Sequence, residues 1–179
     1  YLNGGWGNDV LAGGMGADRL IGGFGRDTAD YATSSAAVQI DLGGSGWGWW
    51  WTGPSASGGD AEGDSLYSIE NVTGSAFDDT LSGSRGANVL AGGASNDVLT
   101  GGRGQDTFVF NTGDGEDTVT DFDSGSDWWW WHVAGDVVQL DVDGFTGFAD
   151  VIDAATQARD NVAIDFGNGD VLTLENTQV

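Results

Sequence analysis

The 179-residue chain contains no cysteine and no lysine, and both absences restrict its chemistry. Without cysteine no disulfide can stabilise the fold, so we expect bound metal to take that role. Five arginines against 28 acidic residues give a net charge of −23. We expect such a chain to repel nucleic acid, anionic membranes and itself unless cations neutralise its carboxylates.

Long apolar runs and catalytic motifs are missing as well. No segment approaches the ~18 apolar residues that a membrane-spanning helix needs. The single histidine, His132, is interpreted as an ordinary loop residue, because a general base needs positioned partners. The sequence has no His-Glu-x-x-His, Gly-x-Ser-x-Gly or Walker motif. Carboxylate pairs of the glycosidase kind stay open, since acids are abundant, but we predict that the chain is not an enzyme.

The regular feature of the chain is a nine-residue repeat, Gly-Gly-x-Gly-x-Asp-x-U-x, in which U is a large apolar residue. Its central copies are adjacent, at 92–100 and 101–109. Further copies begin at Gly4, Gly13, Gly22, Gly74 and Gly83. The departures from the pattern are Ala29 at the apolar position, Phe77 in place of a glycine and Asn88 in place of the aspartate.

Each repeat combines a six-residue turn with a three-residue strand. Glycine takes positive φ without steric cost, which allows the tight turn, and the strand points its apolar residue to one side. Nine residues then form half a coil and eighteen a full coil, which predicts two thin parallel sheets with the apolar residues between them. The residues expected to point inward are Leu11, Leu20, Leu81, Leu90, Leu99 and Phe108.

The turns are candidate calcium sites. A glycine turn directs backbone carbonyls towards the aspartate carboxylate, and Ca²⁺ accepts such flexible all-oxygen ligands better than Mg²⁺ does. We predict several bound Ca²⁺ ions. The candidate ligand positions are Gly5, Gly7, Asp9, Gly14, Gly16, Asp18, Gly23, Gly25, Asp27, Asp79, Asn88, Gly93, Ser95, Asp97, Gly102, Gly104, Asp106, Gly115 and Asp117.

The half-coil geometry also predicts which turns lie together. Successive turns should lie on opposite edges of the roll, and turns eighteen residues apart should stack on the same edge. The residues expected to flank a shared ion are Asp9 with Asp27, Asp79 with Asp97, Asn88 with Asp106, and, across a turn two residues longer, Asp97 with Asp117. The Asn88 site has one carboxylate fewer, so we expect it to bind most weakly.

The repeats resemble the calcium-binding nonapeptide repeats of the RTX family, which are secreted bacterial proteins exported by type I secretion systems. The linking segment 68–81 (SIENVTGSAFDDTL) and the exit segment 106–122 (DTFVFNTGDGEDTVTDF) are also similar to that family. The resemblance implies an all-β fold, a right-handed parallel β-roll with calcium in its turns. It also implies an extracellular location and the type I secretion machinery as a partner.

The expected organisation is a β-roll over 1–127 followed by a cap over 128–179. The roll comprises repeat blocks 4–30 and 74–119 with an excursion at 31–73, and we favour one continuous roll.

The cap is expected to contain a strand at 137–142, a helix from Phe148 to about Arg159, and a hairpin of strands 162–166 and 171–175. A three-residue loop in that hairpin would pair Phe166 with Leu172 and Ile164 with Leu174. We also expect the chain to be the C-terminal part of a longer protein, with its secretion signal incomplete.

Tryptophan is concentrated in two short segments, 47–51 and 128–131. The four consecutive tryptophans at 128–131 lie outside the family pattern, and in a strand at least two of them would point outward. Exposed aromatic patches mark glycan, partner or assembly contacts, and the candidates are Trp49, Trp50, Trp51, Trp129 and Trp130. Local packing onto the cap, or an engineered or provisionally assigned sequence, are the alternatives.

Two functions of different classes are consistent with these features. The first is a calcium-dependent folding module of a secreted RTX protein, which supports the secretion and stability of an attached domain. The second is a structural or adhesive extracellular protein, an adhesin or surface-layer segment, that assembles through calcium and its aromatic loops.

Overall fold

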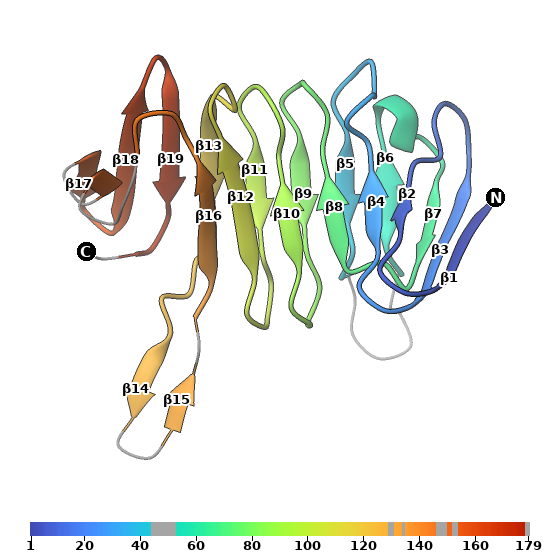
Figure 1. The fold of residues 1–179 in the computed structure, drawn as a ribbon, viewed down its shortest axis with the longest axis horizontal. Coiled ribbons are helices and arrows are strands. Elements are labelled where there is room, and N and C mark those ends of the chain that lie inside the picture. The colour runs from blue at the N-terminus through green and yellow to red at the C-terminus, as the bar shows by residue number, and fades with distance from the viewer. Residues whose placement is uncertain (44–52, 129–130, 134, 146–149, 152–153, 178–179) are drawn as a thin grey trace.

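The computed structural model describes residues 1–43, 53–128, 131–133, 135–145, 150–151 and 154–177. Short strands follow one another around the described chain and stack along one axis as two facing layers (Figure 1). The architecture is the predicted all-β parallel roll. No helix among the described residues is long and apolar enough to cross a membrane.

One sheet of the roll has six strands, all paired in parallel. Its order is β16-β12-β10-β8-β4-β2. The strands are β2 (Val10–Leu11), β4 (Thr28–Asp30), β8 (Asn71–Thr73), β10 (Val89–Ala91), β12 (Thr107–Asn111) and β16 (Val137–Asp141).

The facing layer is formed by two further sheets. The first has the order β1-β3-β7, with β1 (Leu2–Trp6), β3 (Arg19–Phe24) and β7 (Ser65–Tyr67). The second has the order β17-β18-β19-β13-β11-β9-β5-β6. Its strands are β5 (Gln39–Asp41), β6 (Ser55–Ser57), β9 (Thr80–Ser82), β11 (Val98–Thr100), β13 (Glu116–Val119), β17 (Ala155–Ala158), β18 (Asn161–Gly167) and β19 (Asp170–Leu174).

The register of the strands confirms the predicted coil of eighteen residues. Leu2 pairs with Leu20 in one layer, and Leu90 pairs with Phe108 in the other. At β13 the step lengthens to twenty residues, so that Leu99 pairs with Val119. The two extra residues lengthen β12, which has five residues where β10 has three, so the expectation of a longer turn is wrong.

The apolar residue of each repeat points between the sheets. All six residues predicted to do so are at most 3% exposed. Burying a leucine side chain stabilises a fold by roughly 1.5–3 kcal/mol, so this row of side chains is the main apolar contribution to the roll. The excursion adds Ile40, Leu66 and Val72 to the same core.

The two repeat blocks belong to one continuous roll, as we favoured from the sequence. Strand β4 of the first block pairs directly with β8, and Ala29 lies beside Val72, 43 positions later. The excursion forms the antiparallel pair β5–β6 and the 3-10 turn η2 (Gly59–Ala61), and returns through β7 and β8. Strand β5 then joins the second block through β9, where Ile40 pairs with Leu81.

The cap extends both layers of the roll. The predicted cap strand forms as β16, which pairs with β12 in parallel, and β19 of the hairpin pairs with β13. Strands β14 (Ser126–Trp128) and β15 (Trp131–Val133) form a separate antiparallel hairpin that projects from the roll (Figure 1).

Two details of the predicted cap are wrong. Asp150, Val151 and Ala154 are helical, but the chain leaves the helix at β17 and does not continue to Arg159. Residues 155–158 extend instead because they pair with β18, so tertiary pairing overrides the helical pattern. Phe148 and Ile152 lie outside the described residues.

The hairpin register also differs from the prediction. Ile164 pairs with Leu172 and Val162 with Leu174 across a two-residue turn. Asn168 and Gly169 both have positive φ, as a tight hairpin turn of this kind requires. A bulge at Phe166 shifts the register, and apolar residues still face one another.

Candidate calcium-binding turns

Aspartates at the sixth repeat position form hydrogen-bonded ladders along the edges of the roll. The backbone N–H of one aspartate donates to Oδ1 of the residue at the same position one coil later. The bonds are Asp9 to Asp27 (2.8 Å), Asp79 to Asp97 (2.8 Å), Asn88 to Asp106 (2.8 Å) and Asp97 to Asp117 (3.0 Å). The predicted stacking of these four pairs is confirmed, whereas their sharing of an ion stays a prediction.

The second carboxylate oxygen is left without a partner in four of these turns. Oδ2 of Asp9, Asp27, Asp97 and Asp117 is buried and has no hydrogen-bond partner. A buried ionised oxygen without a donor is unfavourable, so these oxygens fit a cation ligand. Among the described residues no three acidic or histidine side chains converge as a metal cluster. Backbone oxygens would therefore have to complete each site.

Without a cation, the turns that carry Asp97, Asp106 and Asp117 disfavour the charged carboxylate. Burial raises the pKa of Asp117 to about 8, and the charges of Asp97, Asp114 and Asp170 add to the effect. Burial likewise raises the pKa of Asp97 to about 7 and that of Asp106 to about 6. A bound divalent ion would favour the charged form and reverse this effect.

The glycine positions explain why the turns can stack. Gly25 has φ +138°, and a Cβ there would collide with the carbonyl oxygen of Gly7 in the turn one coil earlier. Gly93, with φ +106°, would collide in the same way with the carbonyl oxygen of Ser75. Positive φ also occurs at the remaining predicted turn positions, Gly5, Gly7, Gly14, Gly16, Gly23, Ser95, Gly102, Gly104 and Gly115.

The model of the RTX calcium-binding nonapeptide repeat matches four copies in this chain, at residues 1–29 and 73–108. These segments are RTX calcium-binding repeats. The two matched stretches contain the turns that carry Asp9, Asp27 and Asp97, whose Oδ2 atoms have no partner.

The chain is also similar to a solved structure, the extracellular lipase LipA from Serratia marcescens. The two share 20% sequence identity with a TM-score of 0.44. The match covers 99% of this chain and 36% of the lipase, so the chain spans little more than a third of that protein. No curated protein matches the chain.

Four acidic residues that the sequence did not predict also join the RTX ladders. Asp64 accepts the N–H of Asp18 at 2.7 Å, and Glu70 accepts that of Asp27 at 2.9 Å. In the cap, Asp136 accepts the N–H of Asp106 at 2.8 Å, and Asp170 accepts those of Gly113 and Gly115.

These four residues share a signal that the sequence could have provided. Each lies two positions before a buried or half-buried apolar strand residue, as the repeat aspartate does, but the Gly-Gly-x-Gly pattern before it is missing. The segments are Asp64-Ser-Leu, Glu70-Asn-Val, Asp136-Val-Val and Asp170-Val-Leu. Sequence spacing could not reveal them, because they lie 30 to 57 positions from the residues they contact.

Two turns of the RTX region have a different construction. In turns 74–79 and 83–88 the second position is serine, and no residue has positive φ. The N–H of Ser75 donates to Oδ2 of Asp79, and its hydroxyl donates to Oδ1 at 2.9 Å. In the second turn, Oδ1 of Asn88 accepts the N–H of Ser84 at 2.7 Å and its hydroxyl at 3.3 Å.

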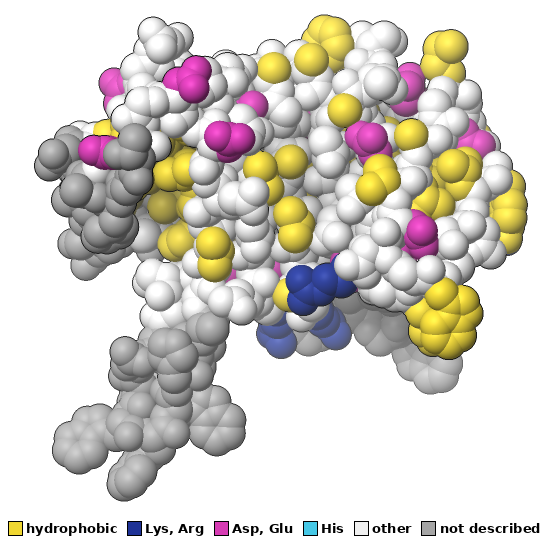
Figure 2. Space-filling model, in the orientation of Figure 1, with side chains coloured by type: hydrophobic (Ala, Val, Ile, Leu, Met, Phe, Trp, Pro, Cys, Tyr) yellow, Lys and Arg dark blue, Asp and Glu magenta, His cyan; other side chains and the backbone are white. Residues whose placement is uncertain are grey.

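The tryptophans predicted to make contacts are not among the residues that the structure describes. Trp49, Trp50, Trp51, Trp129 and Trp130 lie outside the described residues. An exposed aromatic pair lies elsewhere, at the third position of two RTX repeats. Trp6 and Phe24 stack with ring centroids 4.6 Å apart and are 83% and 66% exposed. Figure 2 shows exposed hydrophobic side chains at this N-terminal end of the roll.

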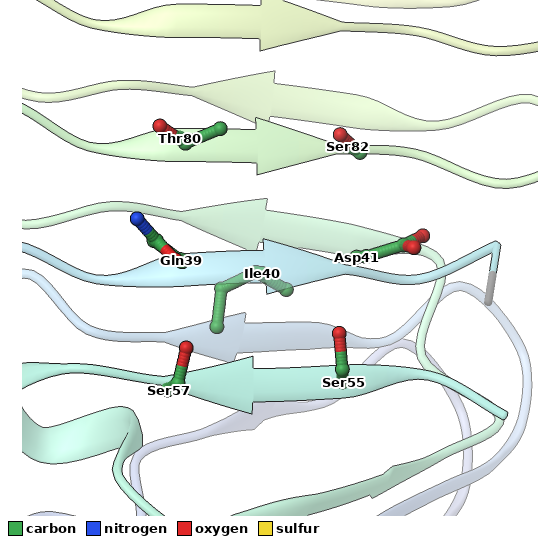
Figure 3. Close-up of a pocket in the computed structure, with 7 residues that line it drawn as sticks. All are labelled: Gln39, Ile40, Asp41, Ser55, Ser57, Thr80 and Ser82. Atoms are coloured by element: carbon green, nitrogen blue, oxygen red, sulfur yellow. The ribbon is translucent and has the colours of Figure 1, made fainter. Parts of the chain in front are cut away.

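An open polar depression lies on the outer face of β5, β6 and β9, with a volume of about 250 Å³ (Figure 3). It is lined by Gln39, Ile40, Asp41, Ser55, Ser57, Thr80 and Ser82. Asp41 is the ionisable residue of this lining, which includes neither a histidine nor a lysine.

Proposed function

We propose that residues 1–179 act as a calcium-dependent folding module of a secreted RTX protein. The observation that carries this proposal is the set of buried carboxylate oxygens without hydrogen-bond partners in turns that stack one coil apart. The net charge of −23 supports it, because the carboxylates would repel one another in the absence of cations.

The residues proposed to hold the ions are Asp9, Asp27, Asp97 and Asp117, together with carbonyl groups of their glycine turns. A bound Ca²⁺ supplies positive charge to the free Oδ2 atoms and links neighbouring turns. The chain positions these oxygens because Oδ1 of Asp27, Asp97 and Asp117 is already held by the neighbouring backbone N–H. In the folded chain these bonds fix the orientation of the carboxylates.

The proposed location is extracellular. Extracellular calcium modules commonly bind at about 10⁻⁴–10⁻³ M, so the chain would stay unfolded at cytosolic calcium levels and fold after export. We propose export by a type I secretion system and a catalytic activity, if the parent protein has one, in a domain outside these residues. The module itself is proposed to be non-catalytic.

A calcium titration tests the proposal. We expect far-UV circular dichroism to change from a disordered to a β spectrum, and the hydrodynamic radius to fall, as calcium rises through about 10⁻⁴–10⁻³ M. Mg²⁺ at the same concentrations should not produce the change. Asp97→Asn should raise the calcium midpoint, whereas Asp160→Asn, an exposed turn position in the cap, serves as the matched control. A compact β spectrum in excess chelator at about pH 8.5, above the raised pKa values of Asp97 and Asp117, would contradict the proposal.

A structural or adhesive role is the second candidate, and the exposed Trp6–Phe24 stack favours it. Sedimentation with and without calcium separates the two. Calcium-dependent association that Trp6→Ala abolishes would support the adhesive role, whereas a calcium-loaded monomer would support the folding module alone.

A further inference from the structure

Turns 74–79 and 83–88 are consecutive turns near the centre of the chain. The first connects β8 to β9, and the second connects β9 to β10. Both have serine where the other RTX turns have a glycine with positive φ. The backbone of these two turns therefore has a different conformation from that of the turns with free carboxylate oxygens.

The carboxylate of Asp79 is fully occupied by protein donors. Oδ2 accepts the N–H of Ser75, and Oδ1 accepts the Ser75 hydroxyl at 2.9 Å and the N–H of Val38 at 2.6 Å. The N–H of Phe77 donates in turn to the Ser75 hydroxyl oxygen at 3.2 Å, which closes the turn on itself. These donors present positive charge to the carboxylate where a cation would otherwise bind.

The neighbouring turn is closed in the same way without any carboxylate. Ser84 donates its N–H and its hydroxyl to Oδ1 of Asn88, and the N–H of Gly86 donates to the Ser84 hydroxyl oxygen at 3.2 Å. The amide nitrogen of Asn88 donates to the carbonyl of Glu70. The side chain of Asn88 thus has its own donor and acceptor partners and carries no negative charge.

We propose that turns 74–79 and 83–88 bind no calcium and that Ser75 and Ser84 replace the ion by hydrogen bonds. This inference rests on the proposed calcium-binding function and divides the turns into two classes. Turns with a free Oδ2 take an ion, and the two serine turns form a metal-independent joint between the N-terminal and C-terminal ion-binding turns. It differs from the sequence-based expectation that Asp79 and Asn88 would each flank an ion.

Counting the ions bound to the full chain tests this division. Equilibrium dialysis against calcium alone, at saturating concentration, gives the number of ions per chain. Asp79→Asn should leave that number unchanged, whereas Asp97→Asn, the same substitution one coil later, should lose at least one ion. Loss of an ion from the Asp79→Asn protein would overturn the inference.

A second variant tests the same inference through the gain of a bound ion. Replacing Ser84 by glycine and Asn88 by aspartate gives the turn Gly-Gly-Arg-Gly-Ala-Asp, which nearly repeats the turn at 101–106. We expect this double variant to bind one ion more than the parent chain, and an unchanged count would contradict the inference. This result is informative even if Asp79→Asn fails to fold.

The outcomes separate the inference from the proposed function. A parent chain that binds no calcium at saturation contradicts the proposed function itself. A parent chain that binds calcium, but loses as many ions through Asp79→Asn as through Asp97→Asn, contradicts only the assignment of the serine turns.

Discussion

The backbone N–H of Asp97 donates to the carboxylate of Asp117 at 3.0 Å, although the two residues are twenty and not eighteen positions apart. The ladder therefore survives a change in coil length, because the two extra residues lengthen strand β12 and the strands keep their pairing. A ladder of this kind makes neighbouring turns depend on each other for both hydrogen bonding and charge.

Substitution of a ladder aspartate should have a larger effect inside a ladder than at its start. Asp97 accepts a bond from Asp79 and donates one to Asp117, whereas Asp9 donates one to Asp27 at the beginning of its edge. We expect Asp97→Asn to raise the calcium midpoint on the order of 10–100-fold, as loss of metal-site support typically does, and Asp9→Asn to raise it less. Calcium titration followed by circular dichroism measures both, and equal shifts would argue against coupling along the edge.

The calcium-free chain should become more structured as the pH falls. The pKa values of Asp97 and Asp117 are raised to about 7 and about 8, against about 3.9 for an unfolded aspartate. The folded state therefore binds more protons between about pH 4 and 8, and its stability is lost as the pH rises through that window.

Circular dichroism in chelator, from pH 8.5 down to pH 5, measures this effect as a gain in β signal. The Asp97→Asn, Asp117→Asn double variant cannot titrate at these positions and should show a smaller gain. A β signal that falls on acidification over this range would contradict the prediction. With calcium present the direction should reverse, since protons compete with the ion for the carboxylates.

Ser95→Gly should stabilise the calcium-loaded chain. Ser95 has φ +87° at a position where other RTX turns have glycine, and a left-handed conformation costs a non-glycine residue about 1–2 kcal/mol. Greater freedom of glycine in the unfolded chain offsets about half of this gain. We expect a rise in Tm. Ser84→Gly, at a position without positive φ, is the matched control and should lower the Tm.

Gly25→Ala and Gly7→Ala separate backbone strain from steric collision. Both positions have positive φ, at +138° and +117°, so both variants should be strained by roughly 1–3 kcal/mol. At Gly25 the new Cβ would also collide with the Gly7 carbonyl, whereas at Gly7 nothing lies within 4 Å. Thermal unfolding in saturating calcium should therefore show the greater loss for Gly25→Ala. Equal losses would show that the stacking contact is unimportant.

Much of the fold could be predicted from the sequence because the repeat is local and periodic. The positions of Leu20, Leu90 and Phe108 follow from the nine-residue period, and all three are buried. The eighteen-residue stacking of Asp9 with Asp27 follows from the same period. The cap was less predictable, because residues 155–158 and the register of β18 with β19 depend on pairing partners and not on local pattern.

The sequence by itself determined the two-layer roll, the inward apolar row and the candidate turns, because short-range steric rules act identically in every repeat. Tertiary structure alone decided which acids join the ladders outside the repeats, since Asp64, Glu70 and Asp170 meet their partners only when distant strands pair. It also decided that Asp79 is satisfied by Ser75 and Val38 while Asp97 keeps a free oxygen. Hydrogen-bond partners depend on three-dimensional approach, and the repeat pattern does not encode them.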